Sequence, residues 1–174
     1  MSERFADVHA RSSVDNLLRT VQQHHVQLSL MADTKASILI TISSIVLTIA
    51  LSRAGEPHLR PALLTIAATS LVSLLLAIVA VLPMFGEPRP GSNRTRNILF
   101  FGHFSSMSED DYMDALHAIL IDDATLYEAA VRDIHSLGVY LYRKKYRFLR
   151  YAYVALLVGF IAATIVEAWV TLSF

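Results

Sequence analysis

Three long apolar runs dominate the hydrophobic pattern of this chain. They cover residues 36–52, 61–86 and 151–174, and only the third contains a charged residue, Glu167. A helix needs about 20 predominantly apolar residues to cross the hydrocarbon core of a bilayer. The second and third runs reach this length, and long basic side chains at both ends of the first can extend it toward the headgroups. The pattern therefore predicts an all-α membrane protein with three transmembrane helices.

A helical pattern also precedes the first apolar run. Between Ser12 and Lys35, apolar residues recur at intervals of three or four. This stripe consists of Val14, Leu17, Leu18, Val21, Leu28 and Met31, with His25 on the same side. No glycine or proline separates the stripe from the first run. We expect an amphipathic helix that continues into the membrane and packs its stripe against another helix, with self-pairing in an oligomer as a special case.

The segment between the second and third runs begins as a loop and ends as a helix. Residues 86–92 read "GEPRPGS", and the two prolines and two glycines predict a loop. Ser108 precedes three acidic residues, which is typical of a helix start. From Glu109 onward Gly138 is the one strong breaker. We expect a long helix, or two stacked helices, that runs into the third span.

The distribution of basic residues predicts which side of the membrane each segment occupies. Arg53 and Arg60 flank the short loop between the first two spans, and the other 13 of the 15 basic residues lie at 1–35 or 86–150. By the positive-inside rule, the N-terminus and the 86–150 region are cytoplasmic and the C-terminus is external. The block "YRKKYRFLR" at 142–150 then meets the anionic headgroups of the inner leaflet.

These patterns divide the chain into six segments. The predicted boundaries are 1–35 for the cytoplasmic amphipathic helix, 36–53 for the first transmembrane helix, 54–60 for an external loop, 61–85 for the second transmembrane helix, 86–150 for a helical cytoplasmic region and 151–174 for the third transmembrane helix.

Composition adds a set of exclusions. The chain is 54% hydrophobic and 17% charged, a balance that is normal for a small membrane protein. It contains no cysteine, which excludes disulfides, thiolate metal sites and cysteine nucleophiles. The seven histidines show no metal-ligand spacing, and no catalytic triad or phosphate-binding loop occurs. We therefore expect no metal, no cofactor and no catalytic residue, and the protein is not expected to be an enzyme.

Small and hydroxylated residues recur on one face of each predicted span. The three stripes are Ser37, Thr41, Ser44 and Thr48; Thr65, Thr69, Ser73 and Ala77; and Ala152, Ala155, Gly159 and Ala163. Small residues let transmembrane helices approach closely, and hydroxyls can bond across the contact. The stripes predict either an ordinary three-helix bundle or, for the first span, a water-lined face in an oligomer.

Glu167 is an ionisable residue inside a predicted span and needs a partner. It lies about 16 residues into the third span, or roughly 24 Å along the helix, close to the outer interface. We expect an ion pair with Arg53 or Arg60. A gating or ion-conducting role is the alternative.

The stretch "NILFFGHFSSMSEDDYMDAL" at 97–116 combines aromatic, amide and acidic residues between two membrane segments. As a hydrophobic plug, its aromatics cap the cytoplasmic helices. As a ligand site, the preceding arginines suit a phosphate, the aromatic faces stack on a base and the amide reads the edge of the base. The residues alone leave both interpretations open.

Three stretches together resemble the transmembrane effector family of the bacterial Pycsar antiphage systems. They are "LMADTKASILI" at 30–40, "RNILFFGHFSSMSEDDYMDAL" at 96–116 and "DIHSLGVYLYRKKYRFLRYAY" at 133–153. The order and spacing of these stretches also fit, over roughly residues 15–170. The most distinctive part is the Asn-x-x-Phe-Phe-Gly-His-Phe core with Tyr112 downstream.

The resemblance implies a function that composition does not show. A pyrimidine cyclase partner senses phage infection and makes cyclic UMP or cyclic CMP. The effector binds this nucleotide, which is the expected ligand, and impairs the bacterial inner membrane, so that growth stops or the cell dies. The 86–150 region is then a helical cytoplasmic sensor region. Inner-membrane lipids and further copies of the chain are the other expected partners, and no nucleic-acid polymer is.

Two clusters of residues are the candidates for this function. The expected nucleotide-binding residues are Arg94, Arg96, Asn97, Phe100, Phe101, His103 and Tyr112. Asp33 and Lys35 stand at the cytoplasmic end of the first span, where they either form a helix-end charge pair or couple the sensor to the membrane. Two other functional classes stay open: a constitutive membrane scaffold that docks a protein partner, and a small ion channel subunit.

Overall fold

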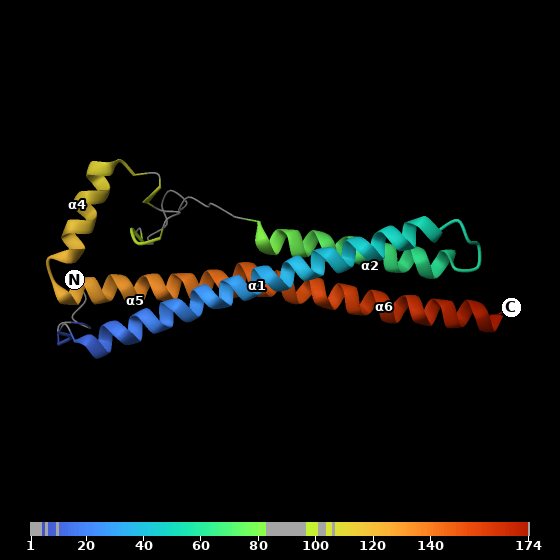
Figure 1. The fold of residues 1–174 in the computed structure, drawn as a ribbon, viewed down its shortest axis with the longest axis horizontal. Coiled ribbons are helices and arrows are strands. Elements are labelled where there is room, and N and C mark those ends of the chain that lie inside the picture. Colours follow the sequence, from blue (N-terminus) through green and yellow to red (C-terminus); the bar gives the residue numbers. More distant parts are fainter. Residues whose placement is uncertain are drawn as a thin grey trace. The chain divides into compact units, whose positions relative to one another are not determined.

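Every regular element of the structure is a helix, over the residues that it describes (Figure 1). The computed structural model describes residues 5, 7–9, 11–82, 97–100, 104–105 and 107–173. Its elements are α1 (Ser12–Arg53), α2 (Arg60–Val81), α4 (Glu109–Leu120), α5 (Asp123–Tyr140), the π-helical segment η2 (Leu141–Tyr146) and α6 (Arg147–Ser173). Three helical runs, Ser12–Arg53, Arg60–Val81 and Asp123–Ser173, are long and apolar enough to cross a membrane. This confirms the predicted all-α fold class.

The chain forms two compact units. Unit 1 comprises Met1–Gln27 and Pro83–Tyr140, and unit 2 comprises Leu28–Leu82 and Leu141–Phe174. The division falls inside α1, after Gln27, and at the first residue of η2. Each unit therefore contains part of α1 and part of the continuous helical run from α5 to α6.

The amphipathic segment and the first span form one helix, as predicted. α1 is 42 residues long and contains neither glycine nor proline. Its inward face is narrower than the predicted stripe. Val14, Leu18, Val21 and His25 are half-buried, whereas Leu17 is 62% exposed and Leu28 and Met31 are exposed too. The inward face continues through Ala32, Ala36 and Leu39, which are buried in unit 2.

Small residues bring the spans of unit 2 together, as the stripes of the second and third spans predict. α2 and α6 pack along each other through Thr69, Ser73 and Ala77 on one side and Ala152, Gly159 and Ala163 on the other. The two helices approach closely at Gly159, where a Cβ atom would lie 2.6 Å from the Cβ of Thr69. A side chain at this position is therefore sterically excluded.

A chain of buried hydrogen bonds joins the three spans. The Ser43 hydroxyl of α1 donates to the Ser73 hydroxyl of α2 over 3.2 Å, and Ser73 donates to the Ala152 carbonyl of α6 over 2.8 Å. All three residues are fully buried. Inside a bilayer such groups find no water, so each hydroxyl needs a partner within the protein.

The predicted stripe of the first span faces away from this contact. Ser37, Thr41 and Thr48 are exposed, and each hydroxyl donates to the backbone carbonyl four residues earlier, over 2.9–3.0 Å. The contact with α2 is made instead by Ser43, one position before the predicted Ser44. The bundle interpretation is therefore wrong for Ser37, Thr41 and Thr48, which lie on the outside of the three-helix bundle, whereas Ser44 is half-buried.

The helix after Ser108 ends earlier than its composition indicates. α4 stops at Leu120, and Asp122 starts α5 by accepting a hydrogen bond from the Thr125 backbone N–H over 3.2 Å. The segment therefore forms two helices and not one long helix. Gly138 does not break α5, and a Cβ at this position would lie 3.3 Å from Nε2 of His25. The absence of a side chain at Gly138 lets α5 approach α1 closely within unit 1.

The partner of Glu167 differs from the prediction. Its Oε1 lies 3.3 Å from Nδ1 of His58, a residue of the loop between α1 and α2. Over the part of the chain that the structure describes, His58 is the basic side chain within ion-pair distance of Glu167. Arg53 and Arg60, the expected partners, are exposed. The sequence pattern does not indicate His58 as a partner, because a histidine is not permanently charged at neutral pH.

The close approach at Gly159 yields a stability prediction. Replacing Gly159 with alanine forces α2 and α6 apart, and we expect the free energy of unfolding to fall by about 1–3 kcal/mol, as in overpacked cores. Urea unfolding of the detergent-solubilised protein, followed by circular dichroism, measures the change.

Gly55 supplies the matched control for Gly159→Ala. Nothing lies within 4 Å of a Cβ at Gly55, so Gly55→Ala should change the free energy of unfolding little. Equal unfolding curves for the two variants would show that the Thr69–Gly159 contact does not limit the packing of α2 and α6.

Candidate functional site

Asn97 attaches the short segment 97–100 to α5 in unit 1. Its Nδ2 group donates to the Asp133 carboxylate over 2.8 Å and to the Ser136 hydroxyl over 3.0 Å. Its Oδ1 accepts from the Leu99 backbone N–H over 3.2 Å. Asn97 and Asp133 are each 8% exposed, so this contact is almost closed to water. The amide expected to read a base is thus engaged with the protein itself.

Two aromatic pairs also involve residues of the predicted stretch. The Phe100 ring lies 6.4 Å from the Tyr140 ring of α5, and the Phe104 ring lies 5.1 Å from the Tyr112 ring of α4, measured between centroids. Both pairs are tilted, a favourable geometry for aromatic rings. Tyr112 thus packs on an aromatic neighbour from the predicted stretch. Four other predicted residues lie outside the described residues: Arg94, Arg96, Phe101 and His103.

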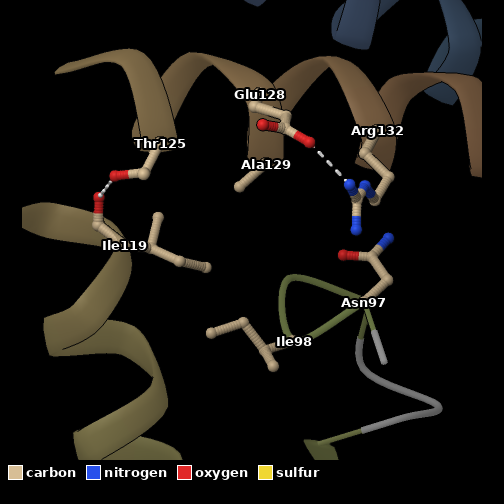
Figure 2. A pocket seen from close by; sticks show the side chains of 7 residues that line it. All are labelled: Asn97, Ile98, Ile119, Thr125, Glu128, Ala129 and Arg132. Carbon is tan, nitrogen blue, oxygen red and sulfur yellow. Dashed lines mark hydrogen bonds and ion pairs between the residues drawn. The ribbon is translucent and has the colours of Figure 1, made fainter. Parts of the chain in front are cut away.

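A cavity of about 180 Å³ opens beside Asn97 (Figure 2). Its apolar walls are Ile98 from the segment after Asn97, Ile119 from α4 and Ala129 from α5. Its polar lining is formed by Asn97, Thr125, Glu128 and Arg132. The segment after Asn97 and the consecutive helices α4 and α5 of unit 1 therefore meet at one small concave surface.

The polar end of the cavity is an ion pair on one face of α5. The Arg132 guanidinium donates to the Glu128 carboxylate over 2.7 Å, at the i, i+4 spacing that places both side chains on the same side of a helix. The side chains of Arg132 and Glu128 are 44% and 27% exposed. Solvent and small molecules therefore reach this end of the cavity.

The N-terminal part of α1 is attached to α5 by a hydrogen bond between side chains. The Tyr127 hydroxyl donates to the Asp15 carboxylate over 2.7 Å. This bond, and then burial of the phenol, raise the pKa of Tyr127 above its ordinary value of 10.0. The tyrosine therefore stays protonated, and the bond intact, throughout the neutral pH range.

Asp33, the first residue of the expected coupling pair, contacts a different lysine from the one predicted. Both oxygens of its carboxylate lie 2.7 Å from Nζ of Lys145 in η2, and the same ammonium donates to the Ser29 hydroxyl over 2.9 Å. The Lys145 side chain is only 13% exposed. Lys35 is exposed, because residues two apart on a helix point in different directions. A charge pair between Asp33 and Lys35 is therefore not formed.

Several residues of this site escaped the sequence analysis. Glu128 and Arg132 lie in a segment without unusual composition. Asp133 opens the third stretch that resembles the family, but no local pattern links it to Asn97, 36 residues earlier. One signal was available, because Glu128 and Arg132 stand four apart with opposite charges. Such pairs are common on solvated helix faces, so this signal does not by itself indicate a site.

Fold and site together define a membrane protein with three potential spans and a helical unit that carries a small, solvent-accessible cavity. Comparison with family models identifies it further. The chain matches the Pycsar effector protein domain over residues 16–172, nearly its whole length, and it belongs to this family. It is an antiphage defence effector of the Pycsar type. Neither a search of curated proteins nor a search of solved structures finds a match.

The matched region contains both the Asn97–Asp133 contact and the Asp33–Lys145 contact. Asn97 and Asp133 belong to the second and third of the stretches that resemble the family, and Asp33 and Lys145 belong to the first and third. The stretches that indicate the family are thus bonded to one another in pairs. Each of the two units holds one of these pairs.

The attachment at Asn97 is testable through stability. Asn97→Ala leaves the buried Asp133 carboxylate without its amide donor, and we expect a loss of about 1–3 kcal/mol in the free energy of unfolding. Thermal or urea unfolding measures the change, with Asn16→Ala on the exposed side of α1 as the matched control. An Asn97→Ala variant as stable as the control would argue that the amide is not an anchor.

Proposed function

We propose that this effector binds a cyclic pyrimidine nucleotide, cyclic UMP or cyclic CMP, and then impairs the bacterial inner membrane. A partner pyrimidine cyclase supplies the nucleotide on phage infection, and the resulting growth arrest or cell death stops the infection. The observation that carries this proposal is the match to the Pycsar effector protein domain over residues 16–172. In this proposal the protein acts by binding and conformational change, without catalysis.

Unit 1 is the part best suited to the nucleotide. It holds the cavity, the aromatic pairs and the polar contacts around Asn97. On the topology predicted from basic residues it lies in the cytoplasm, where a cyclase product is available. Arg94, Arg96, Phe101 and His103 stay candidates for ligand contacts, and Phe100 and Tyr112 lie close enough in sequence to join them.

Two continuous helical runs give unit 1 a route to the membrane spans. α1 contributes to both units, and so does the run of α5, η2 and α6. The junction in the second run is a π-helical segment, a form that is rare within helices and often occurs at functional sites. A ligand shifts such a system only if it binds one arrangement more tightly than the other.

The Asp33–Lys145 pair is the proposed latch of the resting state. Lys145 lies in the π-helical segment, and its ammonium holds α1 through Asp33 and Ser29. Tyr146, the next residue, donates from its hydroxyl to the Leu28 carbonyl over 3.0 Å. Ligand binding releases this set of bonds, and the spans repack or assemble. This gives Asp33 the coupling role expected for it, with Lys145 in place of Lys35 as its partner.

The outward hydroxyl stripe of α1 supports assembly into a homo-oligomer. Ser37, Thr41 and Thr48 lie on the exposed side of the first span, whereas most exposed residues of α2 and α6 are aliphatic or aromatic. In lipid, polar residues on a helix favour contact with another helix. A second copy of the chain that covers this stripe, or a water-filled path along it, accounts for membrane damage by several small chains.

The nucleotide response is the first experiment. Titration of the detergent-solubilised protein with cyclic UMP, cyclic CMP, cyclic AMP and cyclic GMP, followed by calorimetry, should show binding of a pyrimidine nucleotide. A nucleotide concentration ten times the dissociation constant should also raise the unfolding temperature of the protein, because the nucleotide binds the folded state.

The other outcomes separate the alternative functions. A protein that ignores both pyrimidine nucleotides but captures a protein partner is a membrane scaffold. A protein that conducts ions in planar bilayers without nucleotide is a channel subunit. Either result would overturn the proposed function.

The latch is tested by leakage from vesicles. Lys145→Met removes the ammonium from Asp33, so we expect proteoliposomes with this variant to leak a trapped dye several-fold faster without nucleotide. The swap Asp33→Lys with Lys145→Asp should restore nucleotide dependence, because the pair re-forms with opposite charges.

Arg143 is the matched control for the latch, since it is an exposed basic residue of the same π-helical segment. Arg143→Met should leak no faster than the original protein. If Lys145→Met behaves like Arg143→Met, or leaks less than the original protein in the presence of nucleotide, the ion pair is not a latch.

A further inference from the structure

The cavity beside Asn97 has room for one flat ring. Its volume of about 180 Å³ is below the roughly 300 Å³ at which pockets for drug-sized ligands begin, so it cannot enclose a whole nucleotide. A one-ring base can enter while a sugar and a phosphate stay outside.

The walls of the cavity suit the faces of such a ring. Ile98, Ile119 and Ala129 supply apolar surface from the segment after Asn97, from α4 and from α5 (Figure 2). These walls come from three separate stretches of unit 1. A ring between them loses water from both faces and is held by dispersion and hydrophobic contact.

The polar end of the cavity suits the edge of a pyrimidine. Glu128 presents a carboxylate acceptor next to the guanidinium donors of Arg132. Uracil carries an N–H donor between two carbonyl acceptors, and cytosine carries an amino donor beside a ring-nitrogen acceptor. An adjacent acceptor and donor can therefore bond either base, with the Glu128–Arg132 contact opening to admit it.

We propose that this cavity is the seat of a pyrimidine base, with Glu128 and Arg132 bonding its edge and Ile98, Ile119 and Ala129 enclosing its faces. The inference rests on the proposed function and assigns the edge of the base to Glu128 and Arg132, which lie outside the aromatic stretch expected from sequence. The ribose and cyclic phosphate extend from the open side of the cavity. The base then ties the Asn97 segment and α4 to α5, the helix that continues through η2 into α6.

The position of the cavity links its occupancy to the spans. Arg132 precedes Asp133, whose carboxylate holds Asn97, so a base at Arg132 also bears on the attachment of the 97–100 segment. Residues 123–173 form one helical run, so a change in α5 is transmitted along a continuous backbone. No other path between the units is needed.

The test compares nucleotide affinity among single variants of the full-length, detergent-solubilised protein. Ala129→Leu fills the cavity, Arg132→Met removes the donor and Glu128→Gln changes the acceptor while keeping its shape. Loss of a hydrogen bond to a charged group costs about 10- to 100-fold in affinity. We expect calorimetry with cyclic UMP and cyclic CMP to show at least a tenfold loss for each variant.

Two exposed residues provide matched controls. Ala118→Leu adds the same side chain on the outer side of α4, and Arg19→Met removes an arginine from the exposed side of α1. Both should bind like the original protein. Unfolding curves without nucleotide identify any variant that has lost its fold. In that case Glu128→Gln, which preserves the shape and volume of the side chain, decides whether the cavity binds the base.

The outcomes distinguish this inference from the proposed function. If the original protein binds a pyrimidine nucleotide and the three cavity variants bind it equally well, the proposed function stands and the cavity is not the base site. If the original protein binds neither nucleotide, the proposed function fails and this inference fails with it. Tight binding of cyclic AMP or cyclic GMP that the cavity variants abolish would overturn the assignment to a one-ring base.

Discussion

The Ser73 hydroxyl is the point on which the three-helix arrangement of unit 2 depends. It accepts a hydrogen bond from Ser43 and donates one to the Ala152 carbonyl, so a single side chain joins all three spans. Small residues make this possible, because a bulky residue at Ala77, Ala152 or Gly159 would keep the backbones too far apart for a serine to bridge. In lipid a broken bond cannot be replaced by water. The spans therefore have few alternative arrangements.

Unit 1 is held together in a different way. Two polar contacts join distant segments of this unit: Asn97 with Asp133, and Asp15 with Tyr127. The Glu128–Arg132 pair beside the cavity is partly exposed, so its bond can be exchanged for contacts with a polar ligand. The spans of unit 2 are joined instead by fully buried hydroxyl groups. This difference between the units agrees with the proposed roles, in which unit 1 binds the nucleotide and unit 2 acts on the membrane.

The three stretches that indicate the Pycsar effector family acquire a structural meaning from their contacts. Residues 96–116 and 133–153 meet through Asn97 and Asp133, and residues 30–40 and 133–153 meet through Asp33 and Lys145. The third stretch takes part in both contacts and also contains the π-helical segment. Asn97 and Asp33, the candidates for ligand binding and for coupling, are thus each bonded to the same helical run, Asn97 at Asp133 and Asp33 at Lys145.

The sequence by itself determined the helices, the candidate spans and the small-residue faces of the second and third spans, because these depend on periodicity and composition over a few helical turns. Only the tertiary structure decided which side of the first span faces inward. Ser43, and not the stripe of Ser37, Thr41, Ser44 and Thr48, makes the hydrogen bond to the second span. The tertiary structure also decided the partners of Asp33, Asn97 and Glu167, which lie 112, 36 and 109 residues away, the last counted from His58 to Glu167. A buried polar residue needs a partner, and the sequence predicts this need. The identity of the partner depends on how distant helices pack, which no local pattern in the sequence indicates.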